Sequence, residues 1–368
     1  MGKRRALMIG AGGMAGRWAR AFVPLHGERV EIVGLVDVKP EVLEATGDAI
    51  GLPLARRFTS MEEAFGQVDD ADCCFVAVPP AFHEEAVVRA AEKGLAILSE
   101  KPLSDTWEAC RRIYTAAGRA GVKMQVMQNY RYIATTLTLR HAVQSCDLGR
   151  INYVVARFAA DYREWLAWGA EFRHKMRHAL LLEGAVHHFD QLRNLAGGDP
   201  HYISGWEWNP PWSTSKGEFN NLYVLKLTNG VHASYEGSGT AGGEQNSWHE
   251  ESYRVECEHG AVSLGRDKIV RVHRFRRGGG LQTEEVPLLM PLAPGHSPVK
   301  DQGHGAVIGQ FLDWLDGGPT PETTLEDNIH SIAAVFAAIE ASATNQTIDV
   351  AAMVAQASAP PAASAATP

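Results

Sequence analysis

The chain has 368 residues, a length that suits two domains better than one. Apolar residues make up 45% of the chain, as in ordinary globular proteins, and no apolar run approaches the roughly 18 residues of a membrane span. A formal net charge of −8 gives no electrostatic reason to bind nucleic acid or an anionic membrane. The five cysteines have no metal-type spacing and the N-terminus lacks the apolar core of a secretion signal, so we expect a cytoplasmic protein.

A glycine-rich turn follows the first predicted strand, Ala6–Gly10, and precedes a helix predicted to run through Phe22. Its first glycine permits a tight turn, its second lets the backbone approach a pyrophosphate, and the small Ala15 lets the helix pack on the strand. The amides that open such a helix have no internal partners and point at a bound anion. The turn residues expected to hold a dinucleotide are Gly10, Gly12, Gly13, Met14 and Ala15.

An acidic residue ends the next predicted strand, Val30–Val36. Asp37 stands roughly where a carboxylate meets the adenosine ribose hydroxyls of a dinucleotide. It favours NAD as the cofactor because it would repel a 2′-phosphate, whereas the nearby cation Lys39 leaves NADP open.

Strands and helices go on alternating up to Met127, which predicts a Rossmann dinucleotide-binding domain over residues 1–128. Short apolar strands separated by amphipathic helices favour a parallel sheet covered on both faces, with the ligand at one edge. The remaining helices are predicted at Glu41–Ile50, Met61–Phe65, Glu84–Lys93 and Thr106–Ala120, and the remaining strands at Cys73–Val78, Ala96–Leu98 and Lys123–Met127.

Two of these strands end in residues that suit the nicotinamide half of a dinucleotide. After the first, Pro79 helps to stop the strand and stiffen the loop, and His83 either touches the ligand or only begins the next helix. Glu100 and Lys101 follow the second strand. A lysine ammonium at that edge can stabilise a developing alkoxide, although a solvated charge is the commoner role of such a lysine.

The pattern changes after Gln128 and predicts a second, α+β domain over residues 129–350, with a large, mostly antiparallel open sheet. Thr228-Asn229-Gly230 is a hairpin signal between two of its strands. Its helices are predicted at Ile133–Ser145, Gly305–Leu315 and Leu325–Ser342, and its strands at Ile151–Ala159, Leu222–Leu227, Val231–Glu236, Arg254–Cys257, Ala261–Leu264 and Ile269–Arg274. Residues 351–368, rich in Ala, Pro and Ser, are expected to be a flexible tail.

The third cluster of polar residues runs from Glu183 to Asp190. In a helix, Glu183 and His187 lie four residues apart on one face, where the carboxylate can orient the imidazole and raise its basicity for general-base catalysis. The alternative is a helix whose polar groups are satisfied within the fold. We expect no metal here, because adjacent His187 and His188 point about 100° apart on a helix.

The chain resembles the Gfo/Idh/MocA oxidoreductases, a family that includes glucose–fructose oxidoreductase and inositol dehydrogenases. Most of the resemblance rests on Pro79-Pro80-Ala81-Phe82-His83 followed by Glu100-Lys101-Pro102 at this spacing, and it extends to about Val350. The resemblance implies that Lys101 contacts the reacting hydroxyl and the nicotinamide ribose. It also implies a homodimer or homotetramer, since an open sheet needs its exposed face covered.

The family motif Asp-x-Gly-x-His-x-x-Asp appears here as Glu183, Ala185, His187 and Asp190. The resemblance therefore gives His187 the proton-transfer position. Glu stands for the first Asp and Ala for the Gly, which leaves the role of Glu183 open.

Substrate contacts are expected after the last parallel strand and before the His187 helix. The resemblance implies that Asn129 lies beside the cofactor and that the residues after it face the substrate. Aromatic rings stack on sugar faces and arginines bind hydroxyls or carboxylates, although each such residue could instead serve the fold or an interface. The expected substrate-binding residues are Tyr130, Arg131, Arg163, Trp165, Arg173 and His188.

The predicted function is an NAD(P)-dependent oxidoreductase that moves a hydride between nicotinamide and a carbinol of a sugar, cyclitol or sugar acid. Its catalytic residues are Lys101, His187 and Glu183. Two alternatives stay open. One is a redox-neutral sugar isomerase, lyase or glycosidase that uses NAD transiently, and the other is a non-catalytic sugar- or nucleotide-sensing protein on the same fold.

Overall fold

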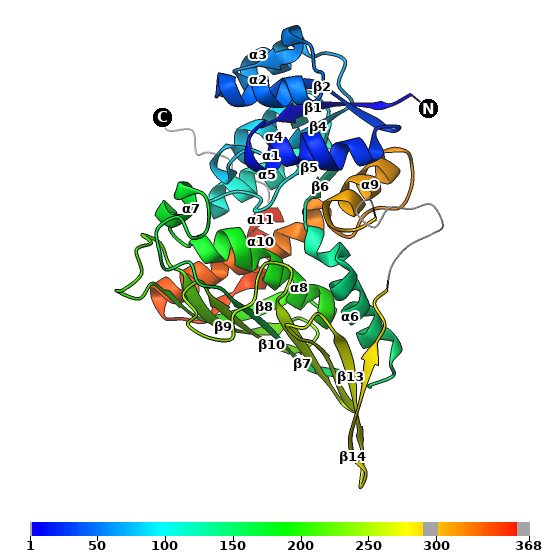
Figure 1. The fold of residues 1–368 in the computed structure, drawn as a ribbon, viewed down its shortest axis with the longest axis vertical. Coiled ribbons are helices and arrows are strands. Elements are labelled where there is room, and N and C mark those ends of the chain that lie inside the picture. The colour runs from blue at the N-terminus through cyan, green and yellow to red at the C-terminus, as the bar shows by residue number, and fades with distance from the viewer. Residues whose placement is uncertain (1, 290–300, 359–368) are drawn as a thin grey trace, which may run out of the picture. The chain divides into compact units, whose positions relative to one another are not determined.

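The computed structural model describes residues 2–289 and 301–358, which fold into two compact units (Figure 1). Unit 1 comprises Met1–Met127, His304–Ile329 and Ala352–Pro368, and unit 2 comprises Gln128–Gly303 and His330–Ala351. Residues 304–329, which the sequence predicts in the second domain, fall in unit 1.

Unit 1 is built on six parallel strands in the order β3-β2-β1-β4-β5-β6. This is the strand order of a doubly wound dinucleotide-binding sheet, and it changes direction between β1 and β4, where such sheets bind their ligands. The strands are β1 Arg4–Ile9, β2 Val30–Val36, β3 Arg57–Phe58, β4 Cys73–Val76, β5 Ala96–Ser99 and β6 Met124–Val126.

The helix after the glycine turn changes type along its length. It begins as α1 (Gly13–Arg17), continues as the π-helix η1 (Trp18–Phe22) and ends as the 3-10 helix η2 (Val23–His26). The other helical segments of unit 1 are α2 Pro40–Ala49, η3 Leu54–Arg56, α3 Met61–Gln67, η4 Pro80–Phe82, α4 His83–Glu92, α5 Trp107–Ala120 and α9 Gly303–Leu315.

Packing explains why α9 belongs with unit 1 despite its position in the sequence. Trp18 packs edge-on against Phe75 of β4, and Phe75 packs against Phe311 of α9, with all three rings fully buried. At the end of this helix, Arg4 forms an ion pair with Asp316. The Phe75–Phe311 and Arg4–Asp316 contacts join residues 236 and 312 positions apart, which no local sequence pattern reports.

Unit 2 contains a nine-stranded sheet in the order β14-β13-β12-β11-β7-β10-β9-β8-β15. Its neighbours are antiparallel except for β7 and β10, so the prediction of a mostly antiparallel open sheet is confirmed. The strands are β7 Ile151–Ala159, β8 Pro200–Trp208, β9 Asn220–Leu227, β10 His232–Ser238, β11 Ser252–Cys257, β12 Gly260–Leu264, β13 Val270–Arg276, β14 Gly280–Val286 and β15 Ile348–Asp349.

One face of this sheet is covered by helices and the other is exposed. In β9, Tyr223 and Leu225 are buried, whereas Leu222 and Val224 between and beside them are exposed. The Tyr223 hydroxyl donates to the Ala338 carbonyl at 2.9 Å, which fixes the helix α10 on the buried face. The helical segments of unit 2 are η5 Asn129–Tyr132, α6 Ala134–Ser145, α7 Glu171–Lys175, η6 Leu181–Ala185, α8 Val186–Ala196 and, from His330 onward, α10 Leu325–Thr344. The last helix, α11 Val350–Ser358, falls in unit 1 from Ala352 onward.

Four strands, β3, β8, β14 and β15, and two α-helices, α7 and α11, were not predicted. The strand β8 carries Gly205, where a side chain would lie 2.1 Å from the Leu222 carbonyl oxygen, and β14 is polar and exposed, so neither shows an apolar pattern. The tail prediction is wrong for residues 351–358, because they belong to α11, where Val354 and Ala357 are buried. Residues 359–368 lie outside the described part of the chain. Among the described helices, none has both the length and the apolar character to cross a membrane.

Candidate functional site

The glycine turn has the backbone geometry that a dinucleotide-binding loop requires. Gly10 has φ +108°, and a Cβ there would lie 2.7 Å from the Ala77 carbonyl oxygen and 3.0 Å from Ala15 Cβ, so only glycine fits. Gly13 has φ +48° with open space where a side chain would project. The loop therefore leaves room for a phosphate group at the start of α1, and the residues present fit the pyrophosphate of a dinucleotide.

Asp37, directly after β2, braces this turn. Its Oδ2 accepts hydrogen bonds from the amides of Ala11 and Gly12 at 2.9 and 3.2 Å, and its Oδ1 accepts one from the Lys39 amide at 3.0 Å. The carboxylate is half-buried and has further lone pairs, so it can also accept from ribose hydroxyls. The sequence pattern predicted the contact with ribose but did not indicate the hydrogen bonds between Asp37 and the glycine turn.

The side chain of His83 connects the loops that follow β4 and β5. Its ring is fully buried, with Nε2 2.8 Å from the Val78 carbonyl oxygen and Nδ1 3.3 Å from that of Leu103. Burial lowers the pKa of His83, which keeps the ring neutral. Pro79 is exposed at the surface of the same loop. We therefore infer that His83 supports the loops rather than touching a ligand.

Glu100, after β5, lies in a buried polar cluster. It accepts a hydrogen bond from the Trp18 indole at 2.9 Å and lies 3.5 Å from the His304 ring. Burial alone would raise the pKa of Glu100, but its hydrogen bond and charge interaction with His304, together with the charge of Lys101, hold it below the usual value. The ionised carboxylate also accepts from the Lys101 amide at 3.2 Å, and so orients the residue that carries the ammonium. Neither Trp18 nor His304 was predicted, because both are remote in sequence.

In unit 2, His187 is held by residues that follow the last strand of unit 1. Its Nδ1 lies 3.1 Å from Gln128 Oε1, and its ring stacks on Tyr130 with centroids 4.1 Å apart. Because a carbonyl oxygen only accepts, Nδ1 carries the proton and Nε2 carries the lone pair. This is the tautomer that a general base at Nε2 needs. Gln128 was missed by the sequence analysis; it stands beside the predicted Asn129.

The predicted α-helix around Glu183 is instead a π-helix, η6, which passes into α8 just before His187. Gly184 permits it to pack closely, since a Cβ there would lie 2.8 Å from the Trp248 ring. The wider turn changes the angular spacing of Glu183 and His187 from that expected, and single π-turns recur at functional sites. Glu183 is buried and forms an ion pair with Arg173 at 3.1 Å.

Both parts of the chain match known protein families. The family model described as "Oxidoreductase family, NAD-binding Rossmann fold" matches residues 4–128, and that of the GFO/IDH/MocA C-terminal domain matches residues 136–263. The chain belongs to the GFO/IDH/MocA oxidoreductase family. It is therefore an oxidoreductase with an NAD-binding domain, as predicted.

Relatives in this GFO/IDH/MocA family match along nearly the whole chain. "Uncharacterized protein y4oX" of Sinorhizobium fredii is 38% identical over 94% of this chain and 95% of its own length. The 1,5-anhydro-D-fructose reductase of Ensifer adhaerens is 26% identical over 93% of this chain and 97% of its own. A crystal structure of an oxidoreductase from Agrobacterium radiobacter with NAD+, L-tartaric acid and magnesium has a TM-score of 0.80 at 19% identity, covering 95% of this chain and 99% of that one.

Two of the predicted substrate-binding residues of this GFO/IDH/MocA protein are buried in polar networks. Arg131 forms a two-pronged ion pair with Asp190, with both bonds at 2.7 Å, and Ser331 also donates to Asp190 at 2.7 Å. Burial would raise the pKa of Asp190, but Arg131 and Arg193 hold it below its usual value. His188 is fully buried, with Nδ1 2.6 Å from the Tyr235 hydroxyl. These contacts help to hold α8 in place, and the contact of Arg131 and His188 with substrate stays a prediction.

Of the other predicted substrate residues, Trp165, Arg163 and Arg173 are accessible and Tyr130 is buried. Trp165 is 39% exposed, and Arg163 is paired with Asp161 at 2.6 Å and lies over the Trp212 ring. The Arg173 side chain is 33% exposed beside Glu183. Tyr130 is buried and stacks on the His187 ring, and its neighbour in the chain, Asn129, is also buried. Their contacts with a ligand stay predictions.

Proposed function

We propose that the protein oxidises a carbinol of a sugar, cyclitol or sugar acid with NAD, or reduces the corresponding carbonyl. The observation that carries the proposal is His187, buried, stacked on Tyr130 and fixed through Nδ1 in the tautomer that leaves Nε2 as a base. A relative named 1,5-anhydro-D-fructose reductase supports a sugar-like substrate. When bound, the nicotinamide accepts or donates the hydride.

We propose that His187 moves the hydroxyl proton. Nε2 takes the proton as the hydroxyl is oxidised, and the charge that develops on the ring is stabilised because Nδ1–H already donates to Gln128. Glu183 stabilises the same charge as a carboxylate, with Arg173 restraining it. Tyr130 is a poor alternative base, since burial and the charge of Glu251 raise the pKa of its hydroxyl far above neutral pH.

We propose that the Lys101 ammonium stabilises the alkoxide as it forms. Glu100 keeps its negative charge while buried, and it accepts a hydrogen bond from the Lys101 backbone amide. This bond fixes the backbone position from which the Lys101 side chain extends. A neutral side chain at this position would remove the stabilisation that the ammonium gives to the alkoxide.

Oxidation is separated from the redox-neutral alternative by stoichiometry. The purified protein would be mixed with NAD and a panel of sugars, cyclitols and sugar acids, and NADH would be followed by absorbance beside chromatographic analysis of product. The proposal predicts one NADH for each product molecule. Product that accumulates well beyond the NADH formed would support transient oxidation, and neither product nor NADH across the panel would contradict the substrate class.

We also propose that the protein is a cytoplasmic homo-oligomer assembled through the exposed face of its nine-stranded sheet. Trp206, Leu222 and Val224 are 58, 49 and 60% exposed on neighbouring strands, a patch that subunit contact would bury. The five free cysteines suit a reducing compartment. Sedimentation should show a dimer or tetramer that Val224→Glu disrupts, whereas Lys93→Glu, at an exposed position of unit 1 away from this sheet, is the control. A monomeric unaltered protein would contradict this.

A further inference from the structure

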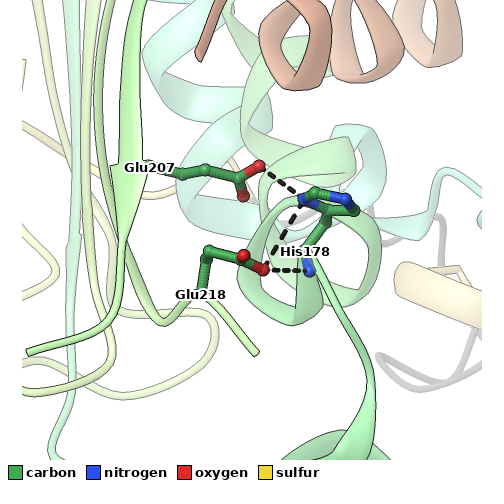
Figure 2. A group of neighbouring side chains, drawn as sticks. All are labelled: His178, Glu207 and Glu218. Carbon is green, nitrogen blue, oxygen red and sulfur yellow. Dashed lines mark hydrogen bonds and ion pairs between the residues drawn. The ribbon is translucent and has the colours of Figure 1, made fainter. Parts of the chain in front are cut away.

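Three side chains of metal-binding type converge in unit 2, apart from the residues assigned to catalysis. His178 lies between α7 and η6, Glu207 lies in β8, and Glu218 lies just before β9. Figure 2 shows both carboxylates directed at the His178 ring, and one ligand atom from each residue lies within 4.8 Å of the others. Each ligand therefore comes from a different segment of the chain: a strand, the residues before a second strand, and a loop.

The spacing is close to that of a tetrahedral site. Nδ1 of His178 lies 3.6 Å from Glu218 Oε2 and 2.5 Å from Glu207 Oε1. Ligand atoms bonded at about 2.0–2.2 Å to a tetrahedral Zn²⁺ lie roughly 3.4 Å apart. Glu218 is already at that spacing, and Glu207 reaches it if its carboxylate rotates by about 1 Å away from the ring.

An unsatisfied oxygen also points to a ligand. The Glu207 side chain is only 4% exposed, and its Oε2 is buried with no hydrogen-bond partner in the described part of the chain. A buried carboxylate oxygen without a partner costs free energy, so such atoms are rare unless an ion or water occupies the site. Oε2 belongs to the carboxylate that already faces His178, so a cation between the three residues would satisfy it.

We propose that His178, Glu207 and Glu218 bind one divalent transition-metal ion of the Zn²⁺ type. An imidazole with two carboxylates favours Zn²⁺ over Mg²⁺ or Ca²⁺, which prefer oxygen ligands alone. The side chains of His178 and Glu218 are 21 and 23% exposed, which leaves a fourth position for water. The neighbouring cation Arg177 lies 3.6 Å from Glu218 but is 76% exposed, and it turns to solvent when the metal binds. The site departs from our expectation of no metal.

The metal would fix the segment that leads to the proposed catalytic helix. The His178 carbonyl accepts the hydrogen bond of the Leu182 amide at 2.9 Å, so His178 stands at the start of η6, five residues before Glu183. Binding through Nδ1 would place the ring proton of His178 on Nε2 and would replace the hydrogen bond between His178 and Glu207. The site itself does not depend on the proposed oxidoreductase mechanism.

Isothermal titration with ZnCl2 tests the proposal on the untagged full-length chain after treatment with a chelator. We expect saturable binding of one equivalent of Zn²⁺ per chain. His178→Asn, Glu207→Gln and Glu218→Gln should each weaken this binding by at least about tenfold. Asn is chosen because His178 has φ +55°, a left-handed conformation that Asn tolerates.

The matched control is Glu258→Gln combined with His259→Asn, which removes an exposed Glu and an exposed His from the same unit. Zn²⁺ affinity should not change in this variant. Circular dichroism and thermal unfolding identify folded variants, and any one folded member of the three suffices. The proposal is overturned if no stoichiometric Zn²⁺ binding occurs, if folded variants of the three residues bind as tightly as the unaltered chain, or if Mg²⁺ binds in preference.

Discussion

The cofactor residues of unit 1 are held mainly by the backbone, whereas the proton-transfer residues of unit 2 are held by side chains. The turn at Gly10–Gly16 is shaped by backbone torsions and by two amides that donate to Asp37, all within the first 37 residues. His187 is instead held by side chains, Gln128 at one ring nitrogen and Tyr130 against its face, which lie almost 60 residues before it. The first arrangement is local in sequence and the second is not.

The difference decides what each region tolerates. A backbone-built loop fails when a side chain is added, because the space belongs to the ligand or to the neighbouring chain. A side-chain network fails when one member is removed, because its buried partners keep their charges and lose their counterparts. Single substitutions in the glycine turn and in the side-chain network can therefore distinguish these two modes of failure.

The largest effect on stability is expected at the buried pair that holds α8. Arg131→Ala leaves Asp190 ionised and buried, which should lower the free energy of unfolding by about 3–5 kcal/mol. Arg150→Ala is the control, since Arg150 pairs with Glu258 while 91% exposed and should lose under about 1 kcal/mol. Urea unfolding followed by circular dichroism measures both. Equal losses of unfolding free energy in the two variants would show that Arg131 does not stabilise the fold, and would favour its predicted contact with substrate.

A smaller, local effect is expected in the glycine turn. A Cβ at Gly12 would lie 3.2 Å from Val42 Cγ1, so Gly12→Val crowds the loop and fills space needed by the pyrophosphate. We expect NAD affinity to fall at least about tenfold, a loss of roughly 1.4 kcal/mol in binding, while the fold survives. Gly66→Val adds the same side chain where nothing lies within 4 Å and should leave binding unchanged. Unchanged NAD affinity in a folded Gly12→Val protein would move the cofactor elsewhere.

The smallest effect is expected at Asp37, where the two roles can be separated. Asp37→Asn keeps an oxygen for the Ala11 and Gly12 amides but loses the charge, so it should mainly narrow the preference for NAD over NADP. Asp37→Ala loses both and should also weaken NAD binding by a few-fold, since one hydrogen bond contributes about 1 kcal/mol. Calorimetric titration with each cofactor distinguishes them. If the unaltered protein binds NADP at least as tightly as NAD, the charge argument is wrong.

The same contrast explains how much the sequence could predict. Each strand of the NAD-binding domain longer than two residues was predicted to within two residues of its ends, and so was the Asn229-Gly230 hairpin, because these depend on local apolar patterns and turn chemistry. The roles predicted for His187, Arg131 and His188 stay predictions, and the sequence did not indicate that Arg131 and His188 are buried in polar networks. Their burial depends on partners such as Asp190 and Tyr235, and no spacing rule brings those together. For the same reason Gln128 and His304 went unnoticed.

The central claim is that unit 1 binds the cofactor while His187 of unit 2 moves the proton. It is tested most directly by single-turnover oxidation and NAD titration of His187→Ala, with the exposed His232→Ala as control. The account predicts that the chemical step slows by about 10²–10⁴-fold, the usual loss for a general base, while NAD affinity stays within about twofold. Near-normal single-turnover oxidation by His187→Ala would contradict it, whatever the cofactor affinity.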